Sequence, residues 1–252
     1  MTSKTITAAV LLIGDEILSG RTQDVNVQAI ALFLAPFGIQ VHETRTVLDE
    51  QADIVKAVNE LRARYTYVFT TGGIGPTHDD ITADAIAAAF QVEISENSDA
   101  LAIISKRYRD SDAEITTARR RMARIPHGAS LILNPVSGAP GFQMENVFTL
   151  AGVPTIARGM LEDVGHRLKT GAIVHSVTVR GKGLREGDIA VALGELVEKT
   201  PEITFGSYPW FAPGDFGAHL VARGTELQAL ESVVPKLVTI IESHGGHAEV
   251  LK

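Results

Sequence analysis

The sequence predicts an α/β protein in which a parallel β-sheet carries helices on both faces, followed by a smaller α+β unit. Two observations lead to this prediction. Apolar runs alternate with segments of helical periodicity between residues 7 and 90, an order typical of parallel strands joined by crossover helices. The first apolar run, "TAAVLLIG" at 7–14, is continuous rather than alternating, as expected of a strand that is buried on both faces.

The next elements of the first unit follow in order along the chain. Apolar residues recur at helical spacing over 27–34 and 54–61, which predicts two helices. Between them, the period-two alternation of "IQVHETRTV" at 39–47 predicts a strand. The run "YVFTT" predicts a third strand at 67–71, and a third helix is expected over 80–90.

The rest of this unit is less regular. The segment 95–124 lacks strand signals and is predicted to form two helices, the second carrying the arginine-rich run "ARRRMAR" at 118–124. These arginines fit either a solvated helix face or contacts with phosphates or an adjacent subunit. Strands are expected at 130–134 and 147–152, and a helix over 154–168.

The remaining residues predict the smaller unit. Strands are expected over 172–181, 202–209 and 216–224, and helices over 186–199 and 227–243. This βαββα order suggests a small sheet that is covered on one face. The chain of 252 residues is long enough for two hydrophobic cores, and we place the domains at 1–170 and 171–252.

The composition excludes several functions. With 23 Lys and Arg against 30 Asp and Glu, the net charge is -7, so sequence-independent binding to nucleic acid is not expected. The absence of cysteine rules out disulfides, thiolate catalysis and cysteine-based metal sites. The N-terminal apolar run is short and lacks a cleavage signature, and no segment approaches the roughly 20 apolar residues that span a bilayer. We therefore expect a cytoplasmic protein that binds neither nucleic acid nor membrane.

A glycine-rich turn, "TTGGIGPTHDD" at 70–80, joins the third strand to the third helix. Glycines here let backbone N–H groups point into a concavity at the start of the helix, which suits a phosphate group. A merely tight turn would explain the glycines as well. Asp79 and Asp80 would repel a bare phosphate, whereas Mg²⁺ binds one or two carboxylates together with phosphate oxygens. The turn therefore suggests a site for a metal ion and a phosphoester.

A second acidic turn, "GDEILSGRTQDVN" at 14–26, follows the first strand and contributes Asp15 and Glu16. The first and third strands of a doubly wound sheet usually lie close together, so both turns are expected to open on one crevice. Asp49 follows the second strand at the same edge, although capping of the next helix would also explain it. The loop "NPVSGAPGF" at 134–142 either faces this crevice or closes a hairpin.

These motifs resemble a known family. "TGGIGPTHDDIT" is similar to the signature of the MoaB/Mog molybdopterin-binding fold. The whole chain resembles the N-terminal part of the competence/damage-inducible protein A family, and also the molybdopterin-binding-like domain of eukaryotic FAD synthases. The motifs that carry the likeness are "GDEILSGRTQDVN", "TTGGIGPTHDDITADAIA", "NPVSGAPGF" with "LAGVP", and "GLREGDIA" with "GSYPWF".

The resemblance implies a three-layer MoaB/Mog-like domain with a small C-terminal α/β domain, assembled as a homo-oligomer, a dimer or trimer. It implies a nucleotide or pterin ligand and, for the nearest members, metal-dependent cleavage of a nucleotide pyrophosphate such as ADP-ribose or FAD. Asp80 matches the acid of the family's "D-x-T" element, and Asp49 matches the acid after the second strand. We expect Mg²⁺ or Mn²⁺ as cofactor, with Co²⁺ as a further option.

The candidate site residues fall into three groups. The catalytic candidates are Asp80, Asp49 and Asp15. The metal candidates are Asp80, Asp79, Asp15 and Glu16. The candidates for ligand and phosphate binding are Thr71, Gly72, Gly73, Gly75, Thr77, Asn26, Asn134, Gly138 and Pro140.

The chain departs from the family pattern at two motifs. The usual "D-T-N" is Asp24-Val25-Asn26 here, which removes a hydroxyl. The usual "P-G-V-P-x-E" is "AGVPTI" at 151–156, which removes a proline and a carboxylate. If that carboxylate aids metal or ligand binding, catalysis would be weak or altered. A non-catalytic molybdopterin- or nucleotide-binding protein and a molybdopterin adenylyltransferase are therefore the alternatives. No amidase domain is expected, and hence no deamidation of nicotinamide mononucleotide.

Overall fold

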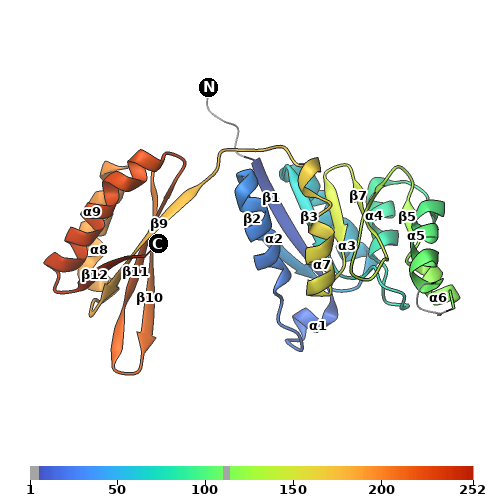
Figure 1. The fold of residues 1–252 in the computed structure, drawn as a ribbon, viewed down its shortest axis with the longest axis horizontal. Helices are drawn as coiled ribbons and strands as arrows, with labels where there is room; N and C mark the ends of the chain where they lie inside the picture. The colour runs from blue at the N-terminus through green and yellow to red at the C-terminus, as the bar shows by residue number, and fades with distance from the viewer. Residues whose placement is uncertain (1–5, 110–113, 252) are drawn as a thin grey trace. The chain divides into compact units, whose positions relative to one another are not determined.

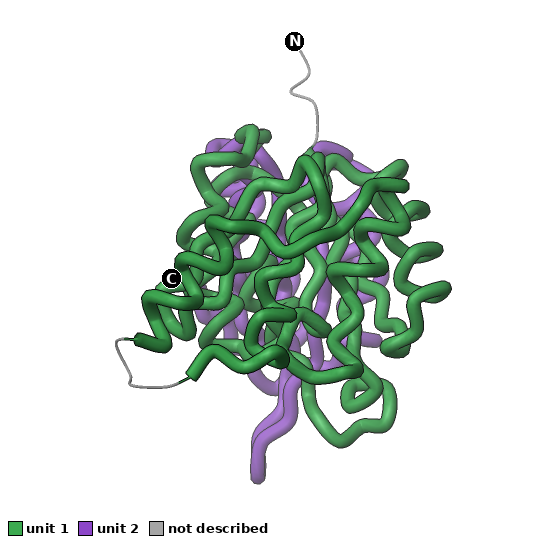
Figure 2. Tube along the Cα trace, turned by 90° about the vertical axis from the view of Figure 1, so that its right-hand side faces the viewer, with its two compact units in different colours: residues 1–172 green, residues 173–252 purple. Residues whose placement is uncertain are grey.

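The computed structural model describes residues 6–109 and 114–251. The chain divides into two compact units, Met1–Ala172 and Ile173–Lys252 (Figure 1, Figure 2). Two clusters of buried apolar side chains form the core of the first unit, and a third cluster forms the core of the second.

In its described residues, the first unit contains a six-stranded sheet with the strand order β2-β1-β3-β8-β7-β6. These strands are β1 (Ile6–Ile13), β2 (Ile39–Val47), β3 (Tyr67–Thr71), β6 (Ser130–Ile132), β7 (Gly141–Met144) and β8 (Val147–Leu150). The pairs β2-β1, β1-β3 and β3-β8 are parallel. Strand β7 runs antiparallel to both β8 and β6. The predicted parallel sheet is confirmed for four strands and continues into an antiparallel edge.

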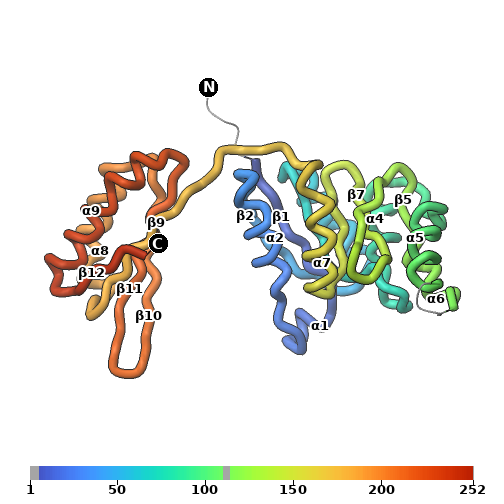
Figure 3. The backbone as a smooth tube through the Cα atoms, in the orientation of Figure 1, coloured from blue at the N-terminus to red at the C-terminus, as the bar shows by residue number. Residues whose placement is uncertain are grey.

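Helices cover both faces of this sheet (Figure 1, Figure 3). On one face lie α2 (Asn26–Leu34) and α7 (Pro154–Leu161), and on the other α3 (Gln51–Arg64), α4 (Thr82–Phe90) and α5 (Ser98–Arg109). Strand β1 serves both cores, because Val10 packs with the α2 side and Leu11 with the α3 side, both fully buried. This double burial explains why the first apolar run is continuous.

Three details of the first unit differ from the prediction. Strand β4 (Ile94–Glu96) pairs antiparallel with β5 (Arg124–Pro126) around the segment expected to hold only the helices α5 and α6 (Thr117–Arg121). Strand β7 lies partly in a predicted loop. These strands have three or four residues, too few for a readable period. The helix expected over 154–168 ends at Leu161 and is followed by a 3₁₀ turn, Gly165–Arg167, where glycine disfavours a continued helix.

Two short elements complete the first unit. Helix α1 (Asp15–Leu18) follows β1, and the 3₁₀ turn Ala35–Phe37 follows α2. Pro36 lies in that turn, and Gly38 ends it in the left-handed region with φ 68°. Proline and glycine commonly follow the end of a helix, and α2 ends just before them.

The second unit is an antiparallel sheet, four-stranded in its described residues, with the order β10-β11-β9-β12. Its elements are β9 (His175–Lys182), α8 (Glu186–Lys199), β10 (Thr204–Ala212), β11 (Asp215–Gly224), α9 (Leu227–Ser243) and β12 (His247–Leu251). Both helices have the predicted bounds and pack on one face of the sheet (Figure 1). The last strand, β12, was not expected and follows the predicted βαββα order. Two glycines precede it, and in the sequence they resemble the frayed end of a helix. Within residues 6–109 and 114–251, none of the helices has the length and apolarity needed to cross a bilayer.

A charge network on β2 links the sheet to α3. The Glu43 carboxylate accepts hydrogen bonds from Arg45 Nη2 at 2.7 Å and from the Tyr65 hydroxyl at 2.8 Å, and it lies 3.3 Å from Arg64 Nη1. The Arg45 hydrogen bond, followed by that of Tyr65, lowers the pKa of Glu43 below its usual 4.5. A carboxyl group with a lowered pKa stabilises the fold above its unfolded pKa, and this contribution is lost as the pH falls through the folded pKa.

We therefore expect Glu43→Gln to lower the free energy of unfolding at neutral pH by about 1 kcal/mol or less, because the network is partly exposed to solvent. The difference from the wild-type protein should shrink as the pH falls below 4.5. Urea unfolding at a series of pH values would measure it, with Lys199→Gln, in an exposed pair with Glu195, as the control. A difference that does not change with pH would contradict this account.

Candidate functional site

The glycine turn begins where β3 passes the end of β1. Leu12 is the register partner of Thr71. A Cβ atom on Gly72 would lie 2.0 Å from the Ile13 carbonyl oxygen, and the φ of Gly72 is 103°. Gly73 has a φ of 66°, and its Cβ would lie 2.1 Å from Thr82 Oγ1. Both positions require glycine, because the turn packs its backbone directly against its neighbours.

Asp80 folds this turn onto itself. Its carboxylate accepts hydrogen bonds from the Gly75 N–H at 2.7 Å, the Thr77 N–H at 2.8 Å and the Thr77 hydroxyl at 2.5 Å. Two N–H groups predicted for phosphate binding therefore donate to Asp80 in this structure. The N–H groups of Gly73 and Ile74 have no acceptor within residues 6–109 and 114–251. They are unoccupied backbone donors of the turn, of the kind from which a phosphate oxygen accepts.

Asp15 and Asp49, at the ends of β1 and β2, hold each other in place. The Asp15 N–H donates to Asp49 Oδ2 at 3.0 Å, and the Asp49 N–H donates to Asp15 Oδ1 at 3.1 Å. Asp49 is not the cap of α3, because Glu50 occupies the N-cap position and makes no side-chain cap hydrogen bond. The ends of the first two strands thus meet through these residues, and the alternative in which Asp49 caps α3 is wrong.

Electrostatics distinguish Asp49 from its neighbours. Burial raises the pKa of Asp49 above its usual 3.8, the N–H of Asp15 lowers it, and the charges of Asp15, Glu16 and Asp79 raise it again. These carboxylates lie near enough to repel one another, and a bound cation would relieve the repulsion.

A cavity of about 620 Å³ opens over these strand ends, within the roughly 300–1,000 Å³ typical of small-molecule sites. Of the predicted site residues, its lining includes Glu16, Asp49, Gly72, Gly73, Gly75, Asp79, Asp80 and Asn134. The lining does not include Asp15, Asn26, Thr71, Thr77, Gly138 and Pro140. The two predicted acidic turns therefore open on one crevice, as expected from the strand order.

The predicted residues outside the lining have other contacts. Asn26 is 4% exposed, and its Nδ2 donates to the Gly152 carbonyl at 2.8 Å. Thr71 is buried at the end of β3, and Thr77 is bound to Asp80. Pro140 lines a separate, smaller cavity. Asn26 thus joins α2 to the loop after β8. It contacts the cavity only indirectly, through Gly152, which is one of the lining residues.

The loop at 134–142 serves both roles that its sequence left open. Asn134 Nδ2 donates to the Ser137 hydroxyl and the Ala139 carbonyl, and its Oδ1 accepts from the Val136 and Ser137 N–H groups. These bonds shape the connection between the antiparallel strands β6 and β7. Asn134, Ser137 and Ala139 also line the large cavity. The loop closes a hairpin and faces the crevice.

The sequence did not reveal the apolar part of the cavity. Apolar lining residues come from β1, the region of α5 and α6, and α7 with the residue before it: Ile13, Tyr108, Met122, Val153, Ile156 and Met160. The only signal was the motif departure at 151–156, where Ile156 stands in place of the family's carboxylate. The others have the periodicity of ordinary core residues, which does not separate a cavity wall from a core.

The carboxylates of the cavity fit a magnesium-like ion to which the protein supplies only some of the ligands. Within the described residues, no three His, Cys, Asp or Glu side chains gather as a complete metal site. Mg²⁺ commonly takes only one or two carboxylates and completes its shell with phosphate oxygens and water. Glu16 and Asp79, both metal candidates from the sequence, line the cavity and offer such carboxylates.

Comparisons with known proteins agree with this fold. Residues 9–170 match a family described as "Probable molybdopterin binding domain", and residues 174–246 match "FAD synthase, middle domain". The first match spans more than half of the chain. The protein therefore belongs to the family of molybdopterin-binding domains.

Several relatives that the chain resembles over much of its length are CinA-like proteins. The chain is 31% identical, over 95% of its length, to a CinA-like protein from Gloeobacter violaceus, and 38% identical, over 77%, to one from Citrifermentans bemidjiense. It spans 58% and 49% of those two proteins. The crystal structure of the protein CinA with unknown function from Thermoplasma acidophilum superposes with a TM-score of 0.60 and 34% identity, covering 65% of this chain and 99% of that one. The family resemblance and the fold class predicted from sequence are confirmed.

Proposed function

We propose that this protein hydrolyses the pyrophosphate bond of a nucleotide such as ADP-ribose or FAD, with Mg²⁺ or Mn²⁺ bound between its carboxylates and the phosphates. The supporting observation is that the glycine turn and carboxylates following β1, β2 and β3 line one cavity. Polar groups suit the phosphates, and apolar residues such as Val153 and Met160 suit a nucleobase. The match of the second unit to an FAD synthase domain supports a nucleotide ligand.

In this reaction, a water oxygen forms a bond to one phosphorus, and the bond from that phosphorus to the bridging oxygen breaks. The bridging oxygen keeps the electron pair, so ADP-ribose and one water give AMP and ribose 5-phosphate. The Asp49 carboxylate lines the cavity and accepts the proton of the attacking water. The Asp15 N–H holds Asp49 in position, while the N–H groups of Gly73 and Ile74 bind phosphate oxygens. The bound metal would supply charge that offsets the negative charge developing in the transition state.

A binding protein that does not cleave its ligand is the second candidate. Ile156 lines the cavity where the family pattern has a carboxylate, and the oxygens of Asp80 are occupied by hydrogen bonds of the turn. Both observations favour a site that holds a nucleotide or a molybdopterin without attacking it. Adenylyl transfer to a pterin is distinguished by its requirement for ATP and by incorporation of AMP.

A product assay separates these candidates. ADP-ribose and FAD are supplied separately with Mg²⁺, Mn²⁺ or Co²⁺, and AMP is followed by chromatography. We expect metal-dependent AMP release that a chelator abolishes, because the carboxylates of the cavity and the phosphates of the substrate are both negatively charged and repel each other without a cation between them. Absence of AMP under every metal, with calorimetry still detecting binding, would refute hydrolysis and favour the binding protein.

A further inference from the structure

The contacts of the four arginines in the run at 118–124 show which of them are already paired within the protein. Arg120 Nη2 lies 2.6 Å from Glu96 Oε1. Arg124 binds Asp84 through two hydrogen bonds of 2.8 and 2.6 Å. These two guanidinium groups are therefore neutralised by carboxylates and serve the structure around α6.

The third arginine, Arg119, is held in another way. Its guanidinium lies over the Tyr108 ring, 4.2 Å from the centroid. It also donates a hydrogen bond to the Glu114 carbonyl. Arg119 thus has a π-face and a backbone acceptor, which leaves Arg121 as the member of the run still to be explained.

Arg121 lacks a carboxylate partner within residues 6–109 and 114–251. In that part of the chain, its hydrogen bonding is limited to one long contact from Nη2 to the Asp80 carbonyl, at 3.4 Å. Its Nε atom is buried without an acceptor. A buried charged donor without an acceptor is unfavourable, and an anionic ligand would correct it.

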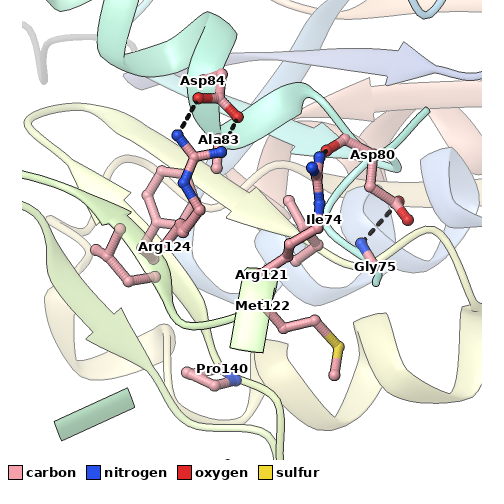
Figure 4. A pocket seen from close by; sticks show the side chains of 12 residues that line it. Ile74, Gly75, Asp80, Ala83, Asp84, Arg121, Met122, Arg124 and Pro140 are labelled. Carbon is pink, nitrogen blue, oxygen red and sulfur yellow. Dashed lines mark hydrogen bonds and ion pairs between the residues drawn. The ribbon is translucent and has the colours of Figure 1, made fainter. Parts of the chain in front are cut away.

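Arg121 also lies at the glycine turn. It lines a small cavity of about 20 Å³, and Figure 4 shows it beside Asp80 and apart from the Arg124–Asp84 pair. Residues of the turn line both this cavity and the large one, among them Gly73 and Gly75. The small cavity has room for one water-sized group, such as a single phosphate oxygen.

The charge around the two cavities makes Arg121 distinctive. The large cavity is lined by several carboxylates and by no lysine or arginine among the described residues. The basic residues lining the small cavity are Arg121 and Arg124. Since Arg124 is bound to Asp84, Arg121 is the cationic side chain of the small cavity that can bind an anion.

We propose that Arg121 binds a phosphate group of the nucleotide at the glycine turn, an inference that rests on the proposed function. Guanidinium groups bind phosphate oxygens through paired hydrogen bonds, and the unpartnered Nε and the weakly bound Nη2 present one such pair. Arg121 is then a phosphate-binding residue that offsets the repulsion between the substrate and the carboxylates of the cavity.

Calorimetry tests this assignment with inorganic pyrophosphate and with the α,β-methylene analogue of ADP-ribose, whose carbon bridge cannot be hydrolysed. Arg121→Met should weaken the binding of both by about 10- to 100-fold. Arg120→Met, a substitution in the same helix, should leave binding within about twofold of wild type. The dependence of affinity on salt should become shallower only for Arg121→Met.

The outcomes separate this inference from the proposed function. If wild-type protein binds and Arg121→Met binds equally well, Arg121 is not a phosphate ligand, while the proposed function stands. If wild-type protein binds neither compound and releases no AMP, the proposed function falls and this inference with it. Should Arg121→Met not fold, Arg121→Lys carries the test. Its ammonium group lacks the paired geometry, so a rise in Kd of at least about threefold is expected, and an unchanged Kd would overturn the assignment.

Discussion

Asp80→Asn is expected to reduce AMP release from ADP-ribose by at least about 100-fold, in the range seen when one pre-organised group of an active site is removed. The Asp80 carboxylate accepts from Gly75 and from both donors of Thr77. Asparagine offers one acceptor oxygen and places an amide donor against the N–H groups of the turn. The turn would lose its shape, and the substrate phosphates would lose their position relative to Asp49. Steady-state AMP release measures the effect.

Two further variants calibrate this result. Thr77→Val removes one of the three hydrogen bonds and should cost about tenfold. Asp53→Asn removes an exposed carboxylate in α3 and should leave the rate unchanged, which controls for the loss of one negative charge. If Asp80→Asn retained a rate within about threefold of wild type, Asp80 would have no part in positioning the turn for catalysis.

Gly72→Ala is expected to destabilise the first unit by about 3 kcal/mol or more. A residue with a side chain at positive φ costs roughly 1–2 kcal/mol, and an overlap that forces backbone apart adds about 1–3 kcal/mol. Here the added Cβ would lie 2.0 Å from the Ile13 carbonyl oxygen, in the backbone of the neighbouring strand. The single tryptophan, Trp210, lies in the second unit, so its fluorescence does not report on the first. Hydrogen exchange of the β1 and β3 amides measures the stability of the first unit directly.

Gly20 provides the matched control. Its φ of 71° is also positive, but a Cβ there would meet nothing within 4 Å. Gly20→Ala should therefore carry only the conformational cost, about 1–2 kcal/mol. Equal protection of β1 and β3 in the two variants would show that the close approach of the glycine turn to β1 is not what stabilises this edge of the sheet.

The sequence predicts most of the fold, because long elements carry a readable period. Helices α8 and α9 have the expected bounds, and the strand order brings Asp15 and Asp49 together. Strands β4, β5 and β12 were not predicted, because they are short and their residues show too little alternation. The βαβ order alone predicted neither these strands nor the antiparallel edge.

The candidate site could be predicted only in part. The sequence shows which residues follow a strand, so it predicts that Asp49 and the glycine turn lie at the edge of the sheet where the cavity opens. It does not show which donors are already occupied, because this depends on the folded backbone, and so the hydrogen bonds of Asp80 could not be predicted. The unpartnered Nε of Arg121 arises from burial by distant segments, and no local spacing signals it. The homo-oligomer implied by the family resemblance stays a prediction, which sedimentation of the purified chain would check.

The reciprocal hydrogen bonds between Asp15 and Asp49 have a consequence for the entropy of ligand binding. A free carboxylate must lose rotational freedom when it meets a ligand, at a cost of about 0.5–1.5 kcal/mol for each ordered side chain. In this protein each of the two side chains is already fixed by the other's backbone N–H. That ordering takes place during folding, and Asp49 is the member of the pair that lines the cavity. Little of the favourable free energy of its contacts with the proposed metal–nucleotide ligand would therefore be lost to ordering its side chain.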